Sequence, residues 1–181
     1  MKNIKKDFIM PILVLTLLCL FMTGALALVN SITYPVIKAG AADRAFTAMK
    51  EIIPFANEFT KLEINREKFP DIPETVSEIY TTDNDSGYIF IIYIRGYGGT
   101  MKLICGINPD GKVIKSKVLA HSETPGFAAT VFDRAVKYEG EGKAFVSRLD
   151  AITGATITSN AYKNALLDAF SAFEAVKGGG S

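Results

Sequence analysis

The sequence predicts an α+β protein in which one membrane-spanning helix precedes a domain built from an antiparallel sheet and flanking helices. An apolar run without a charged residue covers Phe8–Val29. Segments rich in Val, Ile, Tyr and Thr, separated by turn-forming residues, crowd the middle of the chain. The stretch Asn160–Val176 repeats apolar residues at helical spacing. With 181 residues, the chain has room for one ordinary domain besides the membrane segment.

The apolar run has the length of a transmembrane helix. As a helix, residues 8–29 extend about 33 Å, enough to cross a hydrocarbon core of about 30 Å. Pro11 falls near the first turn, where its missing N–H does little harm. A cleaved signal peptide is the alternative, because Ala25-Leu26-Ala27 resembles a cleavage site. The apolar region of a signal peptide, however, is usually only about 7–15 residues long.

The basic residues around the run predict its orientation. Three lysines lie within residues 1–7, and the next basic residue after the run is Lys38. The positive-inside bias therefore places residues 1–7 in the cytoplasm and the chain after about Asn30 on the outer side of the membrane. We expect a plasma-membrane protein with one span and an exported domain.

The exported part divides into a stalk, residues 30–75, and a domain, residues 76–177. The stalk is predicted to contain a helix over 34–53 that ends at Pro54, followed by a polar, poorly patterned stretch. Four strands are predicted: Val76–Thr81, Tyr88–Arg95, Met101–Ile107 and Lys112–Ala120. Turn formers at 83–87 and 108–111 indicate hairpins, and hence an antiparallel meander. Residues 178–181 resemble an added expression linker.

Two less regular segments lie between the last strand and the C-terminal helix. A short helix is expected over Phe127–Val136, and the charged stretch Lys137–Lys143 is expected to be a solvated loop. Neither of these segments predicts a site.

Composition narrows the classes of function. The net charge is +1 and the basic residues beyond the N-terminus are scattered, so the sequence predicts no nucleic-acid partner. There is one His, and Cys19 and Cys105 form no CxxC pair, so no metal site is expected. Cys105 is expected to be a core residue. No nucleophile–base set is apparent, so no catalytic residue is predicted, and redox chemistry would need an organic cofactor.

The segment that precedes the last helix concentrates hydroxyl groups. Four lie within seven residues, around the small residues Gly154 and Ala155, and they belong to Thr153, Thr156, Thr158 and Ser159. Thr158 and Ser159 are both suitable N-cap residues. The N–H groups and the dipole at a helix start also favour phosphate. From the residues alone, an ordinary N-cap and a phosphate site both remain open.

The same segment carries a family resemblance. Asp-x-x-Thr-Gly-Ala-Thr at residues 150–156 resembles the flavinylation motif of the FMN-binding domain in the G subunit of Rnf complexes and in the C subunit of sodium-translocating NADH:quinone reductase. The resemblance implies FMN joined to Thr156 by a phosphoester, with Thr153, Gly154, Ala155 and Thr158 in the same cofactor-binding segment. It also implies a separate magnesium-dependent flavin transferase that reads Asp150, Thr153, Gly154 and Ala155.

Two further segments resemble that family. His121-Ser122-Glu123-Thr124-Pro125-Gly126 looks like its His-x-Glu-Thr-Pro-Gly loop, which makes His121, Glu123 and Thr124 candidate flavin-binding residues. Residues 96–99, Gly-Tyr-Gly-Gly, resemble its glycine-rich entry to the domain. They are no dinucleotide fingerprint, because a strand follows instead of a phosphate-binding helix.

The resemblance implies an electron carrier that is not catalytic by itself. Its partners would be membrane lipid and the other membrane subunits of an Rnf complex, which links reduced ferredoxin and NAD to sodium or proton translocation. The chain length favours the G subunit over the C-type quinone-reductase subunit, which stays the alternative. Two further alternatives are an exported binding or scaffold module whose Thr156 is unmodified, and an independent flavin reductase.

Overall fold

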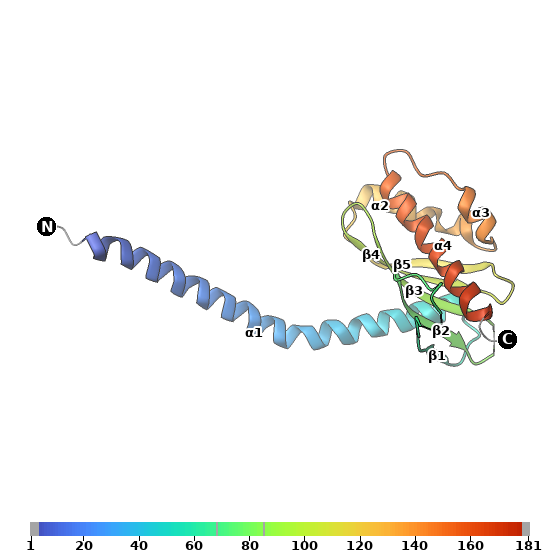
Figure 1. Cartoon of the computed structure of the whole chain (residues 1–181), viewed down its shortest axis with the longest axis horizontal. Helices are drawn as coiled ribbons and strands as arrows, with labels where there is room; N and C mark the ends of the chain where they lie inside the picture. The colour runs from blue at the N-terminus through green and yellow to red at the C-terminus, as the bar shows by residue number, and fades with distance from the viewer. Residues whose placement is uncertain (1–3, 68, 85, 179–181) are drawn as a thin grey trace. The chain divides into compact units, whose positions relative to one another are not determined.

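The structure is a computed structural model that describes residues 4–67, 69–84 and 86–178 (Figure 1). The chain separates into two units, Met1–Asp43 and Arg44–Ser181, which are described in turn. The predicted linker at 178–181 lies outside the described residues except for Gly178. The predicted limits of the flavin domain, residues 76–177, stay a prediction, while the compact unit already begins at Arg44.

The first unit consists of most of helix α1, Ile4–Ile52. This helix is long and apolar enough to cross a membrane, and its large side chains are exposed, with Leu20 exposing 74% of its surface. One expectation was wrong, because Pro11 lies inside the helix and not in its first turn. The helix predicted over 34–53 is confirmed as the last part of α1, which passes through Pro35 and ends at Ile52, before Pro54.

The second unit is built on a five-stranded sheet. Its strands are β1 Phe59–Leu62, β2 Val76–Thr82, β3 Tyr88–Arg95, β4 Thr100–Ile107 and β5 Val113–Ala120. They follow one another in chain order and every neighbouring pair is antiparallel. The predicted meander is confirmed. Strand β1 was not predicted, because it lies in the stretch whose pattern is polar.

One face of the sheet is covered by the C-terminal helices (Figure 1). These are α2 Pro125–Asp133, the 3-10 helix η1 Arg134–Tyr138, α3 Lys143–Arg148 and α4 Thr156–Gly178. Buried side chains of α4 pack on Phe90 and Leu103 of the sheet. The hydroxyl groups of Tyr162 and Ser116 are hydrogen bonded at 2.8 Å, which links α4 to β5.

Three expectations about this layer need comment. Helix α4 begins at Thr156, so Thr158 and Ser159 lie in its first turn and not at its N-cap. The stretch from Lys137 to Lys143 is no simple solvated loop, because it ends η1, begins α3 and contains the buried Tyr138. Cys105 is confirmed as a core residue, and burial raises the pKa of its thiol to about 12.

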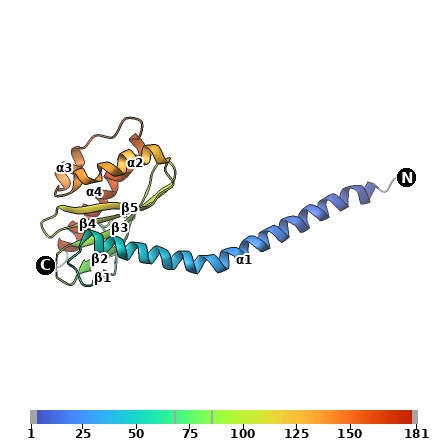
Figure 2. The ribbon, with the colours of Figure 1, turned by 180° about the vertical axis from the view of Figure 1, so that it is seen from behind.

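The last turns of α1 cover the opposite face (Figure 2). Met49 and Ile52 pack there on Ile89 and Ile91 of β3, so β3 is buried on both faces and reads as an unbroken apolar run. The helix comes so close that a Cβ on Gly106 would lie 2.4 Å from the Cγ2 of Ile52. The unit therefore has three layers: helices, sheet, and the end of α1.

Candidate functional site

The loop before α4 is held by side chains from two helices. The guanidinium of Arg134 in η1 donates to the backbone carbonyl of Asp150 at 2.8 Å. The ammonium of Lys163 in α4 donates to the carbonyl of Leu149 at 3.1 Å. Both side chains therefore bind the loop through its backbone carbonyl groups.

The end of this loop turns sharply into the helix. Gly154 has a φ of +84°, a left-handed conformation that favours glycine. The backbone N–H of Ile152 donates to the hydroxyl of Ser159 at 3.2 Å, which closes the loop onto the first turn of α4. Since the first N–H groups of a helix have no acceptor inside it, this turn presents donors and the positive end of the helix dipole.

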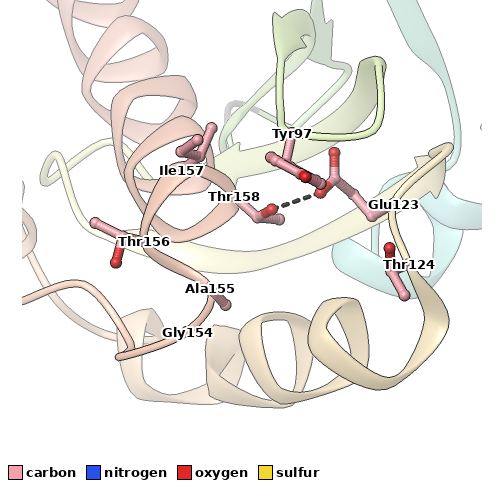
Figure 3. Close-up of a pocket in the computed structure, with 8 residues that line it drawn as sticks. All are labelled: Tyr97, Glu123, Thr124, Gly154, Ala155, Thr156, Ile157 and Thr158. Atoms are coloured by element: carbon pink, nitrogen blue, oxygen red, sulfur yellow. Dashed lines mark hydrogen bonds between the residues drawn. The ribbon is translucent and has the colours of Figure 1, made fainter.

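A cavity of about 510 Å³ opens at the start of α4 (Figure 3). Its walls come from the glycine loop 96–99 between β3 and β4, from the loop 121–124 after β5, and from the loop end and first turn of α4. The lining residues are Tyr97, Glu123, Thr124, Gly154, Ala155, Thr156, Ile157 and Thr158. Segments that are far apart in the sequence thus meet at one site.

A buried carboxylate joins these three segments. Glu123 exposes 6% of its surface. One carboxylate oxygen accepts the backbone N–H of Gly98 at 2.9 Å, and the other accepts the hydroxyl of Thr158 at 2.5 Å. Both oxygens therefore have a donor, as a buried carboxylate requires. The glycine loop and α4 are tied to the loop that carries Glu123.

The glycine loop can close this far only because two of its residues lack side chains. A Cβ on Gly96 would lie 2.3 Å from the Oε1 of Glu123, and one on Gly98 would lie 2.1 Å from the carbonyl oxygen of Ser122. The loop itself is a tight hairpin, in which the N–H of Gly96 donates to the carbonyl of Gly99 at 2.8 Å. The glycines of Gly-Tyr-Gly-Gly thus allow the loop to lie close to Ser122 and Glu123, and they do not form a phosphate-binding turn before a helix.

The four hydroxyls of residues 153–159 differ in their availability. Thr158 is buried and its proton is donated to Glu123. Ser159 is buried and its oxygen accepts the N–H of Ile152. Thr153 is exposed but is not among the residues that line the cavity. Of the four, Thr156 alone is both exposed and on the cavity wall.

The other predicted site residues divide into two groups. Glu123, Thr124, Gly154 and Ala155 line the cavity, whereas His121, Asp150 and Thr153 do not. The Nδ1 of His121 accepts the backbone N–H of Glu123 at 3.2 Å, and its ring packs edge-on against Phe132, with the centroids 4.9 Å apart. His121 therefore shapes the loop that carries Glu123. Its role toward a flavin stays a prediction.

Sequence reasoning missed two lining residues, Tyr97 and Ile157. Tyr97 lies inside the glycine-rich segment 96–99, and Ile157 lies between Thr156 and Thr158. A large apolar side chain among small and polar neighbours is the signal that could have identified both.

The residues present fit an FMN group. The volume lies within the roughly 300–1,000 Å³ typical of small-molecule sites. Tyr97 and Ile157 offer apolar surface to a planar ring, and the start of α4 offers N–H groups to a phosphate. An exposed hydroxyl lies on the same wall.

Comparisons with known proteins agree with the fit to FMN. The FMN-binding domain family matches residues 96–171. The G subunit of the ion-translocating oxidoreductase complex of Shewanella piezotolerans is 31% identical, over 90% of this chain and 87% of that protein. The G subunit of the proton-translocating ferredoxin:NAD(+) oxidoreductase complex of Clostridium ljungdahlii is 26% identical, over 91% of each chain. That of the Na(+)-translocating complex of Acetobacterium woodii is 27% identical, over 76% of this chain and 77% of that protein.

Proposed function

Because this chain belongs to the family of G subunits of ion-translocating oxidoreductase complexes, we propose that it is a membrane-anchored electron-transfer subunit that carries FMN covalently on Thr156. The observation that carries the proposal is the availability of the Thr156 hydroxyl. Thr156 is exposed, is the first residue of α4, and is among the residues that line the cavity.

The position of Thr156 suits a phosphoester. An ester there would bring the phosphate next to the N–H groups of the first turn and to the positive end of the helix dipole. FMN supplies the redox chemistry when bound, while the chain holds the group, orients it and limits its contact with water. A covalent link also keeps the cofactor from being lost by dilution outside the cytoplasm.

A flavin transferase is the partner that attachment requires. In the reaction that the resemblance implies, the Oγ1 of Thr156 forms a bond to the FMN phosphorus of FAD, AMP leaves, and the hydroxyl proton is released. The loop that carries Asp150 is held by Arg134 and Lys163, so it meets a second protein in a fixed geometry. We propose that Asp150 and Thr153, which do not line the cavity, are read by the transferase.

The membrane helix and the family support a place in a complex. We propose that residues 1–7 are cytoplasmic, that residues 8–29 of α1 span the membrane, and that the sheet domain lies on the outer side, where it meets other subunits of the complex. The electron donor and acceptor of a single flavin would be partner subunits of an oxidoreductase like those named for the relatives. Those names include both the proton and the sodium ion as the translocated ion.

A substitution at Thr156 tests the attachment. The chain is produced in a host that contains the flavin transferase and is run on a denaturing gel under ultraviolet light. We expect a fluorescent band for the wild type, none for Thr156→Ala, and a retained band for Thr156→Ser, which keeps a hydroxyl. Mass spectrometry of the peptide covering 149–163 should show FMN minus water on Thr156.

Two results would contradict the attachment. One is a band that persists in Thr156→Ala, which would move the ester to another residue. The other is a wild-type peptide from native membranes with only unmodified threonine, the result expected of a binding or scaffold module.

A further inference from the structure

We propose that Tyr97 and Ile157 are the two walls between which the planar ring of the flavin lies, and that Glu123 is a positioning residue that fixes their separation. The inference rests on the proposed function and adds the residues that bind the ring. It starts from two large side chains that line the cavity and yet remain exposed.

Both walls expose apolar surface where a ligand would cover it. Tyr97 exposes 73% of its surface and Ile157 exposes 55%, although both line the same cavity. Figure 3 shows Tyr97 reaching the cavity from the glycine loop and Ile157 reaching it from the first turn of α4. Aromatic rings stack on planar groups, and branched aliphatic side chains pack on their faces. The pair therefore suits a flat, fused ring system.

The tether and the aliphatic wall are neighbours on one helix turn. Thr156 and Ile157 are consecutive, so their side chains leave α4 about 100° apart, since a turn has about 3.6 residues. An ester on Thr156 thus starts next to Ile157 on the same cavity wall. The ring can then fold back against Ile157 while the phosphate stays at the helix start.

The buried carboxylate links the chain neighbours of both walls. Glu123 accepts the N–H of Gly98, the residue after Tyr97, and the hydroxyl of Thr158, the residue after Ile157. Its two oxygens therefore hold the glycine loop and the helix at one spacing. Because Gly96 and Gly98 have no Cβ, the loop lies close enough to reach the carboxylate.

Quenching of flavin fluorescence by iodide tests the walls. The full chain is purified in detergent with its flavin attached, as wild type, Tyr97→Ala and Ile157→Ala. Bound ligands are typically about 70–90% buried, so we expect loss of one wall to raise the quenching constant roughly twofold. Tyr93→Ala is the matched control, because Tyr93 is 43% exposed on β3 and outside the cavity lining. It should quench like the wild type.

Conservative variants separate the roles of ring and carboxylate. Tyr97→Phe keeps the aromatic ring and should quench like the wild type. Glu123→Ala should raise quenching at least as much as the loss of one wall, because it frees both walls together. Glu123→Gln should quench less than Glu123→Ala, since its amide still accepts from Gly98 and can donate to the Thr158 oxygen.

The outcomes distinguish this inference from the function it rests on. If quenching is unchanged in both Tyr97→Ala and Ile157→Ala while the flavin is still attached, the proposal that these two side chains enclose the ring is wrong. Raised quenching in Tyr97→Phe overturns the role of the ring. Equal quenching in Glu123→Gln and wild type, together with no change in Glu123→Ala, overturns the positioning role. A wild-type chain without flavin contradicts the proposed function instead.

Discussion

At the scale of single residues, the close approach of the glycine loop to Glu123 depends on the absence of a side chain at Gly98. A Cβ on Gly98 would meet the backbone oxygen of Ser122 at 2.1 Å, and backbone atoms cannot move aside as a flexible side chain can. We expect Gly98→Ala to lower the free energy of unfolding by about 1–3 kcal/mol, as overpacked sites do. Urea unfolding of the purified chain, followed by tyrosine circular dichroism, measures the change.

Gly126 supplies the control for that substitution. It lies in α2, and a Cβ there would meet no atom within 4 Å. Gly126→Ala should leave the stability unchanged or raise it by less than about 1 kcal/mol, because alanine is the better helix former. Equal midpoints for the two variants would show that the glycine loop is looser than its geometry indicates.

Sequence reasoning singled out Thr156, the proposed attachment residue, but not the hydrogen bonds that join the three segments at Glu123. Thr156 belongs to a contiguous motif, so it can be identified from the local sequence. The partners of Glu123 are 25 and 35 residues away in the chain. Nothing in the local pattern around Glu123 indicates that Gly98 and Thr158 donate to it, because the sheet and α4 bring these segments together. For the same reason Tyr97 and Ile157 could not be paired in advance.

At the scale of elements, an ion cluster attaches the last turn of α1 to β5. Glu51 forms ion pairs with Lys115 at 2.9 Å and with Lys117 at 2.7 Å. The hydrogen bonds from Lys117 and Lys115 lower the pKa of Glu51 from 4.5 to about 2. The cluster also explains why Lys115 and Lys117 share a face of β5 with apolar residues, because that face meets the last turn of α1, which carries Glu51.

This cluster predicts a pH dependence. A carboxyl whose pKa is lowered by folding stabilises the fold above its ordinary pKa, so the contribution is lost as the pH falls from about 4.5 to about 2. Because all three side chains are exposed, each pair should contribute less than about 1 kcal/mol. Glu51→Gln should flatten the fall of the unfolding midpoint across that range. An unchanged slope, or one insensitive to salt, would contradict the cluster's contribution.

The elements that were missed are those with weak local patterns. Strands β2 to β5 carry β-branched and aromatic residues, and their predicted limits lie within one residue of the observed ones. Strand β1, Phe-Thr-Lys-Leu, has four residues and is in the sheet because it pairs with β2. Helix α3 has six residues, too few for a helical period to be visible. Both β1 and α3 therefore form because of tertiary contacts and not because of a local sequence pattern.

At the scale of the whole molecule, the proposed orientation of the chain predicts the behaviour of fusions at its C-terminal end. We expect a phosphatase fused after Lys177 to be active in cells, because the enzyme folds only outside the cytoplasm, and a cytoplasm-dependent fluorescent protein at the same point to be dark. Replacing Lys2, Lys5 and Lys6 with Gln should lower the phosphatase activity, since positive flanking charge sets the orientation. A bright fluorescent fusion on the unaltered chain would place the domain in the cytoplasm.

The strand order of the sheet also bears on when the cofactor can be attached. Each strand, as it is made, finds its partner already present, because spatial order and chain order coincide. The cavity, however, takes walls from residues 97, 123 and 154–158, and the proposed acceptor hydroxyl comes from α4, the last helix in chain order. A nascent chain that stops short of Thr156 has all five strands but lacks part of the cavity wall and this hydroxyl. If Thr156 carries the flavin as proposed, attachment therefore follows the synthesis of α4.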